Sequence, residues 1–450
     1  MGYKLGIDIG GTFTDFALYN EQTGDMTIHK QLTTPNEPSK SVLDGTRNVL
    51  ANQKLEFRQV TTVVHGTTLV TNALIERKGC TTGMITTAGF RDVLDIAEST
   101  RHDSYDWHIR LQKPLIARDI MPAPMRYEVQ ERIDHYGKVL EPLDIGQVRA
   151  GLNNLLEKYQ IESLAVCLLH SYQNSVHEKT IKDLIIDEYP DLYVSTSAEI
   201  FPFMREYERF TTTSINAYVQ PMVDRYLLMI EQGFKEQGFE GSLYIMASNA
   251  GTLTPETARR FPVRIMESGP TAGALMASHY GDLLNLPNIL SYDTGGTTSK
   301  GALIRDGTLA KSYEMETAQV YEFKKGSGLV VRAPVVDMIE IGAGGGSISE
   351  VDDRGLLRVG PRSSGADPGP ACYAQGGSAP TLTDADLILG YLDSEFFLGG
   401  AMTLDRQAAE CSIEKFVGTP LALDLTAAAW GIHETINENC ARAFRMHAAE

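Results

Sequence analysis

The sequence predicts an α/β fold of two related lobes with a ligand cleft between them, and three observations support this prediction. Short apolar strands alternate with amphipathic helices from Asp144 onward, which is typical of βαβ units around a largely parallel sheet. A strand, an aspartate, a Gly-Gly-Thr bend and a second strand occur twice, about 285 residues apart. The 450 residues suffice for roughly two to four domains of ordinary size.

In the first half of the chain, apolar periodicity and capping signals predict several strands and helices. The predicted strands cover residues 3–9, 16–19, 60–64, 84–87, 163–169 and 192–195. The predicted helices run from Thr68 to about Lys78, over 145–159 and over 175–188. Residues near 100–140 are rich in Pro, Arg, His and Asp, and we expect an inserted loop region there.

The second half predicts a helix over 205–237 that is interrupted near Pro221. Strands are predicted at 243–247, 263–266, 289–292 and 335–341, and a long helix over 424–450. Thr383 is followed three residues later by Asp386, a pattern that resembles a capping box before an apolar helix.

These elements divide the chain into two predicted lobes. We place the boundary near residues 190–205, which gives an N-terminal lobe over 1–195 and a second lobe over 196–450. The second lobe carries glycine-rich insertions at 326–328, 342–346, 365–370 and 376–377. Its last helix stops at Glu450 in mid-pattern, so we expect this lobe to be truncated.

Composition narrows the class of function. The formal net charge of -18 argues against a general nucleic-acid or anionic-membrane surface, because either needs a basic face. No apolar run approaches the ~20 residues that span a bilayer, and Met1 leads directly into a strand, so we expect a cytoplasmic protein. The five cysteines are scattered without CxxC spacing, which disfavours a zinc ribbon, an iron–sulfur cluster held within one segment or a disulfide framework.

The repeated segment carries the functional argument. Residues 5–18 and 290–303 both read strand, Asp, any residue, Gly-Gly-Thr, any residue, a hydroxyl residue and strand. The glycines Gly10, Gly11, Gly295 and Gly296 let the backbone bend closely around an anion. Hydroxyl donors for phosphate oxygens are expected from Thr12, Thr14, Thr297, Thr298 and Ser299.

The aspartates of the two bends predict a cation between protein and phosphate. A carboxylate beside a polyphosphate repels it unless a divalent ion intervenes, and Mg²⁺ is held by one or two carboxylates plus phosphate oxygens. Asp8 and Asp293 are therefore the candidate Mg²⁺ ligands. A single Gly-Gly-Thr is as well explained by a β-turn; two copies in register favour phosphate binding. Neither a Rossmann G-x-G-x-x-G nor a Walker A motif is present at these sites.

Further motifs reveal a resemblance that covers nearly the whole chain. They are residues 6–15, His65–Ala73, Glu267–Pro270, Phe323–Gly328, Ile339–Ser347 and Gly365–Tyr373. Together they resemble the hydantoinase A/5-oxoprolinase family, within the actin, sugar-kinase and Hsp70 superfamily. The resemblance implies two actin-like (ribonuclease H-like) lobes that clasp ATP and Mg²⁺ in the cleft between them. The chain departs from the family at Lys300, where many members carry Asp; here Lys300 is expected to contact a phosphate.

The resemblance also implies an activity and a partner. It implies an ATP-dependent cyclic amidohydrolase subunit (hydantoinase, oxoprolinase or lactamase type, EC 3.5.2) that works with a B-type partner subunit in a hetero-oligomer. Phosphate transfer to the carbonyl oxygen of a small cyclic amide gives an imidate phosphate, which water attacks more readily than the amide. An ATP-dependent ketone carboxylase subunit, of acetone or acetophenone type, is the alternative within the family. A third alternative is an actin-like nucleotide switch without a small substrate.

Several residues keep two interpretations each. Asp15 positions a nucleophile or a metal-bound water, or bonds its own turn. His65 polarises the substrate carbonyl, or bonds neighbouring backbone. Gly344 and Gly345 bind nucleotide, or only let the lobes pack closely. His170 and the pair His177-Glu178 are assigned to capping and packing. The polar residues Arg101, His102, Asp103, Arg110 and Lys113 line the substrate pocket, face the partner or lie on a solvated loop.

Overall fold

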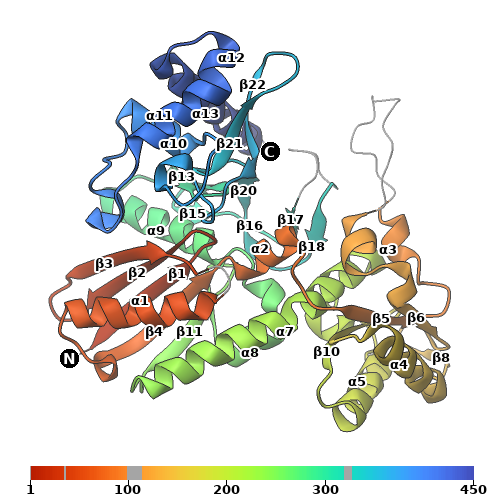
Figure 1. Ribbon diagram of the computed structural model, residues 1–450. Helices are drawn as coiled ribbons and strands as arrows, with labels where there is room; N and C mark the ends of the chain where they lie inside the picture. Colours follow the sequence, from red (N-terminus) through yellow and green to blue (C-terminus); the bar gives the residue numbers. More distant parts are fainter. Residues whose placement is uncertain (1, 35–36, 99–113, 319–326, 450) are drawn as a thin grey trace.

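The computed structural model describes residues 2–34, 37–98, 114–318 and 327–449, and it has the predicted mixed α/β fold. Figure 1 shows three parts: a lobe around the N-terminal strands, a smaller unit around β5 (Thr82–Thr87) and β10 (Tyr193–Thr196), and an upper lobe around β13 (Ile289–Thr294) and β20 (Met338–Ile341). The residues Arg101, His102, Asp103, Arg110 and Lys113 lie outside the described residues, as does part of the expected loop region near 100–140.

The first sheet has six strands in the order β12-β11-β4-β1-β2-β3. They are β1 (Tyr3–Ile9), β2 (Phe13–Asn20), β3 (Met26–Leu32), β4 (Val60–Thr67), β11 (Ser242–Met246) and β12 (Thr252–Leu253). β1 pairs antiparallel with β2 and parallel with β4, and β11 continues parallel to β4. Alternate residues of β1 (Leu5, Ile7 and Ile9) enter the core, as expected for a pleated strand.

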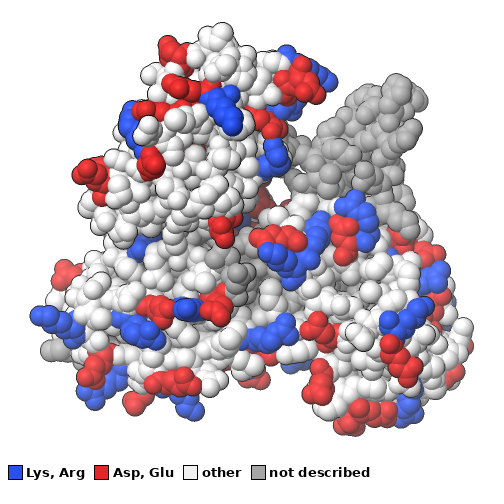
Figure 2. Space-filling view, viewed as in Figure 1, with Lys and Arg blue, Asp and Glu red and all other residues white. Residues whose placement is uncertain are grey.

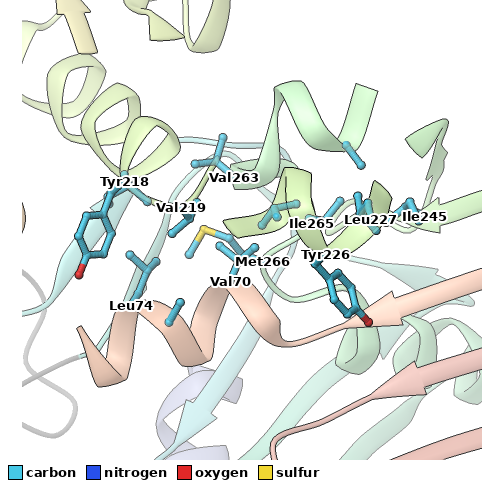
Figure 3. Packing of buried hydrophobic residues seen from close by; sticks show 14 of the residues in the cluster. Val70, Leu74, Tyr218, Val219, Tyr226, Leu227, Ile245, Val263, Ile265 and Met266 are labelled. Atoms are coloured by element: carbon cyan, nitrogen blue, oxygen red, sulfur yellow. The ribbon is translucent and has the colours of Figure 1, made fainter. Parts of the chain in front are cut away.

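The largest core joins this sheet to the long helix α7 (Glu206–Glu236). Figure 3 shows Val70 and Leu74 of α2 (Leu69–Glu76) beside Val219 of α7 and Met266. The predicted interruption near Pro221 is wrong, because α7 runs through it without a break. Pro221 is buried, and so are most residues in the first six turns of α7. This tertiary packing outweighs the helix destabilisation of about 3 kcal/mol that a proline inside a helix causes.

A second sheet, in the order β10-β9-β5-β6, forms the smaller unit. Its strands are β5 (Thr82–Thr87), β6 (Arg126–Val129), β9 (Ser163–Cys167) and β10 (Tyr193–Thr196), covered by α4 (Ile145–Tyr159) and α5 (Val176–Glu188). β9 pairs parallel with both β5 and β10, as the βαβ pattern predicts. Glu178 accepts hydrogen bonds from Leu168 N and Ala198 N, which fits its assignment to packing.

The third sheet belongs to the upper lobe. It contains β13 (Ile289–Thr294), β14 (Ser299–Arg305), β15 (Thr308–Leu309) and β20 (Met338–Ile341), and the helix α9 (Ser268–Leu284) packs against it. A second core joins α10 (Leu382–Leu389), α11 (Arg406–Ile413) and α13 (Leu425–Ala449) to the hairpin of β21 (Ser347–Val351) and β22 (Leu357–Ser363).

Two local predictions in this half are wrong. The predicted strand at 263–266 is a single 3-10 turn over Pro262–Arg264, since a proline at its start presets a helical φ. The capping box of α10 is formed by Thr381 and Asp384, two residues before the predicted pair Thr383 and Asp386. Thr383 and Asp386 are thereby left available for other contacts.

The division of the chain at about residue 195 stays a prediction. Strand pairing shows that segments from both sides of it share one sheet, since β11 at Ser242–Met246 lies beside β4. The face seen in Figure 2 carries acidic and basic side chains interspersed over the described residues.

Candidate functional site

Both Gly-Gly-Thr bends line one cavity of about 410 Å³. They are closed in the same way: Gly10 N donates to Phe13 O at 2.8 Å, and Gly295 N donates to Thr298 O at 2.9 Å. The bends also approach each other closely, because a Cβ placed on Gly296 would lie 2.5 Å from Thr12 Oγ1. The two copies of the repeat therefore face each other across a single site.

The bends offer hydrogen-bond donors to an anion. Among the described residues, the N–H groups of Gly11, Thr12, Gly296 and Thr297 have no protein acceptor. Residues at the N-terminal ends of three helices also line the cavity: Thr68 before α2, Pro270 in α9 and Thr383 in α10. Free N–H groups and the positive ends of helix dipoles both favour a phosphate ligand here.

Asp8 lies at the end of β1 and is held in an environment that disfavours its charge. Burial raises its pKa to about 6, and repulsion from Asp15 and Asp293 adds to the effect. Its Oδ1 is inaccessible to solvent and has no hydrogen-bond partner among the described residues. Only glycines fit beside it, since a Cβ on Gly66 or Gly269 would lie 2.9 or 2.5 Å from Oδ1.

These features fit a Mg²⁺ ion held by Asp8 and Asp293. The unpaired Oδ1 needs a cation or a donor, and Asp293 lines the same cavity. Within the described residues, no group of three or more His, Cys, Asp or Glu side chains is arranged to hold a metal. A cation at this place would take its remaining ligands from water and phosphate, which is the usual arrangement for Mg²⁺.

In each lobe the aspartate is the first of three charged residues that lie opposite one another on three neighbouring strands. In the first lobe Asp8 lies opposite Asp15, which lies opposite Lys30. In the upper lobe Asp293 lies opposite Lys300, which lies opposite Glu340. The order is acid, acid, base in one row and acid, base, acid in the other. All six residues line the cavity, so Lys300 supplies a buried positive charge where the first lobe has Asp15.

The two lysines differ in their surroundings. Lys30 Nζ is half exposed and lies 2.7 and 2.8 Å from the carboxylate oxygens of Asp15. Lys300 Nζ is buried, 2.5 Å from Glu267 Oε2 and 3.4 Å from Glu340 Oε1. Burial alone would lower the pKa of Lys300, but the two glutamates more than offset it and raise the pKa. Lys300 therefore stays charged.

The structure brings most of the predicted ligands to the cavity. Its lining includes Asp8, Gly10, Gly11, Thr12, Asp15, Asp293, Gly295, Gly296, Thr297, Thr298, Lys300 and Gly345. Thr14 is absent from the lining, because its hydroxyl is buried and lies 3.0 Å from Thr33 Oγ1. The register-equivalent Ser299 is likewise buried and donates to Ala343 O. Both hydroxyls therefore lie outside the cavity lining and hydrogen-bond within the protein.

Gly344 also lies outside the lining. A Cβ on Gly344 would lie 2.6 Å from Gly295 O, and Gly345 N and Gly346 N donate to Gly295 O and Gly296 O. The glycine loop thus packs against the second bend, which is the close-packing interpretation for Gly344.

His65 does not reach the cavity lining. Its ring is buried, with Nε2 2.8 Å from Tyr226 Oη and Nδ1 3.4 Å from Ile7 O. Figure 3 shows the Tyr226 hydroxyl directed toward the strands of the first sheet. Burial lowers the pKa of His65 to about 4, so the ring is neutral near pH 7. Strand alternation points this side chain into the core, which is the position expected from its packing interpretation.

Several cavity residues were missed by the sequence analysis. Thr68, Thr71 and Asn72 follow β4 at the start of α2, where the motif His65–Ala73 gave the only signal. Asp386 lines the cavity from α10, and its Oδ1 lies 2.8 Å from His433 Nδ1. An apolar wall is formed by Phe13, Tyr373, Leu382, Leu392 and Phe397.

Fold and site together define an α/β protein in which two repeated Asp-led glycine bends line one cavity. The family described as "Hydantoinase/oxoprolinase" matches residues 209–450, and its N-terminal region matches residues 4–189. The chain belongs to the hydantoinase/oxoprolinase family.

Three relatives set this membership in context. An uncharacterized protein of Methanocaldococcus jannaschii is 38% identical over all of this chain and 65% of its own length. The caprolactamase subunit alpha of Pseudomonas jessenii is 33% identical over 100% of this chain and 63% of its own length. A nucleotide-free acetone carboxylase structure superposes with a TM-score of 0.84 at 30% identity, covering 97% of this chain and 61% of that one. The chain thus spans less than two thirds of these relatives.

None of the described helices is long and apolar enough to cross a membrane. The five cysteines are free thiols, four of them buried.

Proposed function

We propose that this chain is the ATP-binding, substrate-phosphorylating part of an enzyme that opens a small cyclic amide. The observation that carries the proposal is the pair of Asp-led bends lining one cavity. Two facing anion sites suit a polyphosphate better than a single phosphate group. The names of relatives support ATP, since the Pseudomonas jessenii enzyme is described as an ATP-dependent caprolactamase.

The residues divide the work of phosphoryl transfer between positioning and charge. The free N–H groups of the two bends, with Thr12 and Thr297, hold the phosphate oxygens in line. Asp8 and Asp293 would hold Mg²⁺, which offsets the negative charge of the phosphates. Lys30, at the end of its cross-strand row, and Lys300, in the middle of the other, add positive charge.

Phosphorylation removes the resonance that protects the amide. The carbonyl oxygen attacks the γ-phosphorus, the bond to the bridging oxygen breaks, and its electron pair leaves with ADP. Water adds to the resulting imidate phosphate, and cleavage of the C–N bond with protonation of nitrogen opens the ring to an acyl phosphate. A second water hydrolyses this to carboxylate and phosphate. Asp15 is the residue proposed to position a nucleophile or a metal-bound water.

A B-type partner subunit completes the proposal. Some of the relatives are named as subunits, among them the caprolactamase subunit alpha and the acetophenone carboxylase gamma subunit of Aromatoleum aromaticum. We therefore propose a hetero-oligomer in which the partner carries later steps of the reaction.

Ketone carboxylation is the second candidate, and structural similarity favours it. The TM-score is 0.84 to the acetone carboxylase structure and 0.77 to the caprolactamase structure. Sequence identity has the opposite order: it is 33% to the caprolactamase subunit alpha and 30% to the acetone carboxylase beta subunit. In that case the phosphorylated species is an enol or carbonate.

An ATPase assay of the chain with its partner subunit separates these proposals. Stimulation by lactams or hydantoins without bicarbonate is the expected result. Stimulation by a ketone only when bicarbonate is present would instead identify a carboxylase. Slow turnover that responds to a protein partner but to no small molecule would indicate a nucleotide switch and contradict both proposals.

A further inference from the structure

One wall of the cavity is apolar and begins at the first bend. Phe13 follows Thr12 directly, and its ring meets the Phe397 ring edge-on, with centroids 6.2 Å apart. Tyr373 continues the wall, with its ring centroid 5.6 Å from that of Phe397. Aromatic side chains with a few polar groups are the usual lining of a pocket for a small organic ligand, so this wall suits a ring rather than further phosphate.

Asp386 adds a carboxylate to this wall. It lies four residues after Leu382 on α10, so the two side chains share one face of the helix. Helix α10 is tied to the second bend, because the Thr383 hydroxyl donates to Gly345 O at 2.8 Å and Gly345 N donates to Gly295 O at 3.0 Å. These bonds hold the carboxylate beside the wall and in the same cavity as both bends.

The other four carboxylates that line the cavity already have a partner or a proposed cation. They are Asp8 and Asp293 at the proposed Mg²⁺ site, Asp15 beside Lys30 and Glu340 beside Lys300. Asp386 has no lysine or arginine partner in the part of the chain that the structure describes. Its Oδ1 lies 2.8 Å from His433 Nδ1, and its Oδ2 has no hydrogen-bond partner there.

His433 holds this carboxylate from α13, which packs beside α10 (Figure 1). A carboxylate only accepts hydrogen bonds, so His433 Nδ1 carries the N–H while Asp386 is ionised. The imidazole ring stacks on Tyr391, with centroids 5.0 Å apart, and its centroid lies 5.7 Å from that of Trp430. The histidine therefore fixes the orientation of the carboxylate and leaves Oδ2 for a ligand.

Conversion of an amide into an imidate phosphate needs a proton acceptor. The carbonyl oxygen forms the new bond to phosphorus, and the ring nitrogen loses its proton. The electron pair of the N–H bond stays on nitrogen, which forms the C=N double bond. Burial raises the pKa of Asp386, although His433 acts in the opposite direction, and a raised pKa makes a carboxylate a better acceptor.

We propose that the aromatic wall holds the ring of the cyclic amide and that Asp386, positioned by His433, is the general base that takes the amide proton during phosphorylation. This inference rests on the proposed function. Oδ2 of Asp386 accepts the N–H of the bound ring, the wall packs against the methylene groups of that ring, and the carbonyl oxygen faces the phosphates at the two bends.

The test is steady-state ATP turnover by the chain with its partner subunit, with caprolactam, 5-oxoproline and hydantoin as the probes. For the probe that stimulates most, Asp386→Asn should lower kcat about 100-fold or more, because asparagine keeps the shape but takes no proton. The KM for ATP should stay within about twofold of its original value. Asp353→Asn changes an exposed acid outside the cavity and should leave both constants unaltered.

Two rescue measurements separate catalysis from folding. Asp386→Ala should regain about tenfold or more in turnover when formate is added, because this small carboxylate fills the vacated space and accepts the proton. His433→Leu should lower kcat about tenfold, and His433→Asn, which keeps an N–H donor near the Nδ1 position, should restore most of the loss. A purely structural role would show neither rescue.

An unaltered kcat in Asp386→Asn overturns the inference. A large rise in the KM for ATP in that variant also overturns it, since the carboxylate would then bind the base or ribose of the nucleotide. Lost turnover that neither formate nor His433→Asn restores would make the two residues structural. If none of the three probes stimulates the unaltered protein, the proposed function itself fails, and this inference fails with it.

Discussion

Asp8 shows how a single residue is set up for a ligand at a cost to the free protein. Its carboxylate lies against bare glycines, with one oxygen unpaired and its pKa raised to about 6 mainly by burial. In the folded protein without ligand, the ionised form is disfavoured relative to the unfolded chain. A bound cation removes that penalty, so binding and stability are linked at this residue.

The first prediction is that Asp8→Asn stabilises the protein in the absence of Mg²⁺ and nucleotide. Because the folded pKa is raised, the native carboxylate loses stability as pH rises from about 4 through about 6. The amide avoids this loss, and the gain should be about 2–3 kcal/mol at pH 8 and small below pH 4. Denaturant unfolding at both pH values measures it.

Asp191→Asn, at an exposed acid, serves as the control and should change little at either pH. The same Asp8→Asn protein should no longer be stabilised by Mg²⁺ with ATP. Retention of full stabilisation by Mg²⁺ with ATP would remove Asp8 from the ligand set.

Lys300 is the residue of the second hairpin that takes the place of Asp15 in the first. Its ammonium group is buried between Glu267 and Glu340, and Thr71 Oγ1 also donates to Glu267 at 2.9 Å. The pKa of Glu267 is raised, chiefly by burial and despite Lys300. The lysine and Glu267 therefore depend on each other for their charges.

The second prediction concerns this pair. Lys300→Met leaves a buried glutamate without its partner and should cost about 3–5 kcal/mol of unfolding free energy. The double variant Lys300→Met, Glu267→Gln should recover a large part of that loss, as a double-mutant cycle by chemical denaturation would show. Additive losses in the double variant would mean that the two side chains are not energetically coupled.

At the scale of elements, the two hairpins form the proposed phosphate site. Their turns are closed by equivalent hydrogen bonds, and Gly296 allows the second to reach Thr12 of the first. The sequence repeat predicted this pairing, since both copies carry the same glycines and aspartate. It did not predict the reversed charges of Asp15 and Lys300 as part of two cross-strand rows, because no strand was predicted at β3 and β20 joins β14 from a later segment of the chain.

The third prediction uses the close approach of the hairpins. A methyl group at Gly296 would lie 2.5 Å from Thr12 Oγ1, so Gly296→Ala should push the bends apart. We expect ATP binding, measured by calorimetry with Mg²⁺, to weaken by about tenfold or more. Gly273→Ala is the matched control, because open space surrounds that helical glycine and alanine favours helix there. Equal affinity of the two variants would show that the approach of the bends has no part in binding.

The fourth prediction concerns His65 on β4, whose ring lies in the core. Burial lowers its pKa to about 4, so the folded protein resists protonation and loses stability as pH falls from about 6.5 to about 4. Tyr226→Phe removes the hydroxyl at Nε2 and should cost about 1–3 kcal/mol. ATP turnover per folded molecule should remain near that of the unaltered protein. A large fall in turnover without loss of stability would restore the catalytic interpretation of His65.

For the whole molecule, the α/β class could be read from the sequence, whereas the sheet assignments could not. The helix predicted over 145–159 has these bounds in the structure, and the strand predicted over 289–292 runs two residues further, to Thr294, because both follow local periodicity. The continuity of α7 through Pro221 and the pairing of β11 with β4 depend on packing between distant segments. Similarly, the alternation of side chains along a strand places His65 and Thr14 on one face of their strands. Which face of the sheet is buried depends on how the layers pack together.

The central claim is that both bends hold one polyphosphate, and it is tested most directly by a crystal structure of the chain with Mg²⁺ and a non-hydrolysable ATP analogue. The account predicts phosphate oxygens within hydrogen-bonding distance of the N–H groups of Gly11 and Gly296 in one nucleotide, with the metal between Asp8 and Asp293. A nucleotide that contacts only one bend, or that binds outside this cavity, would contradict it.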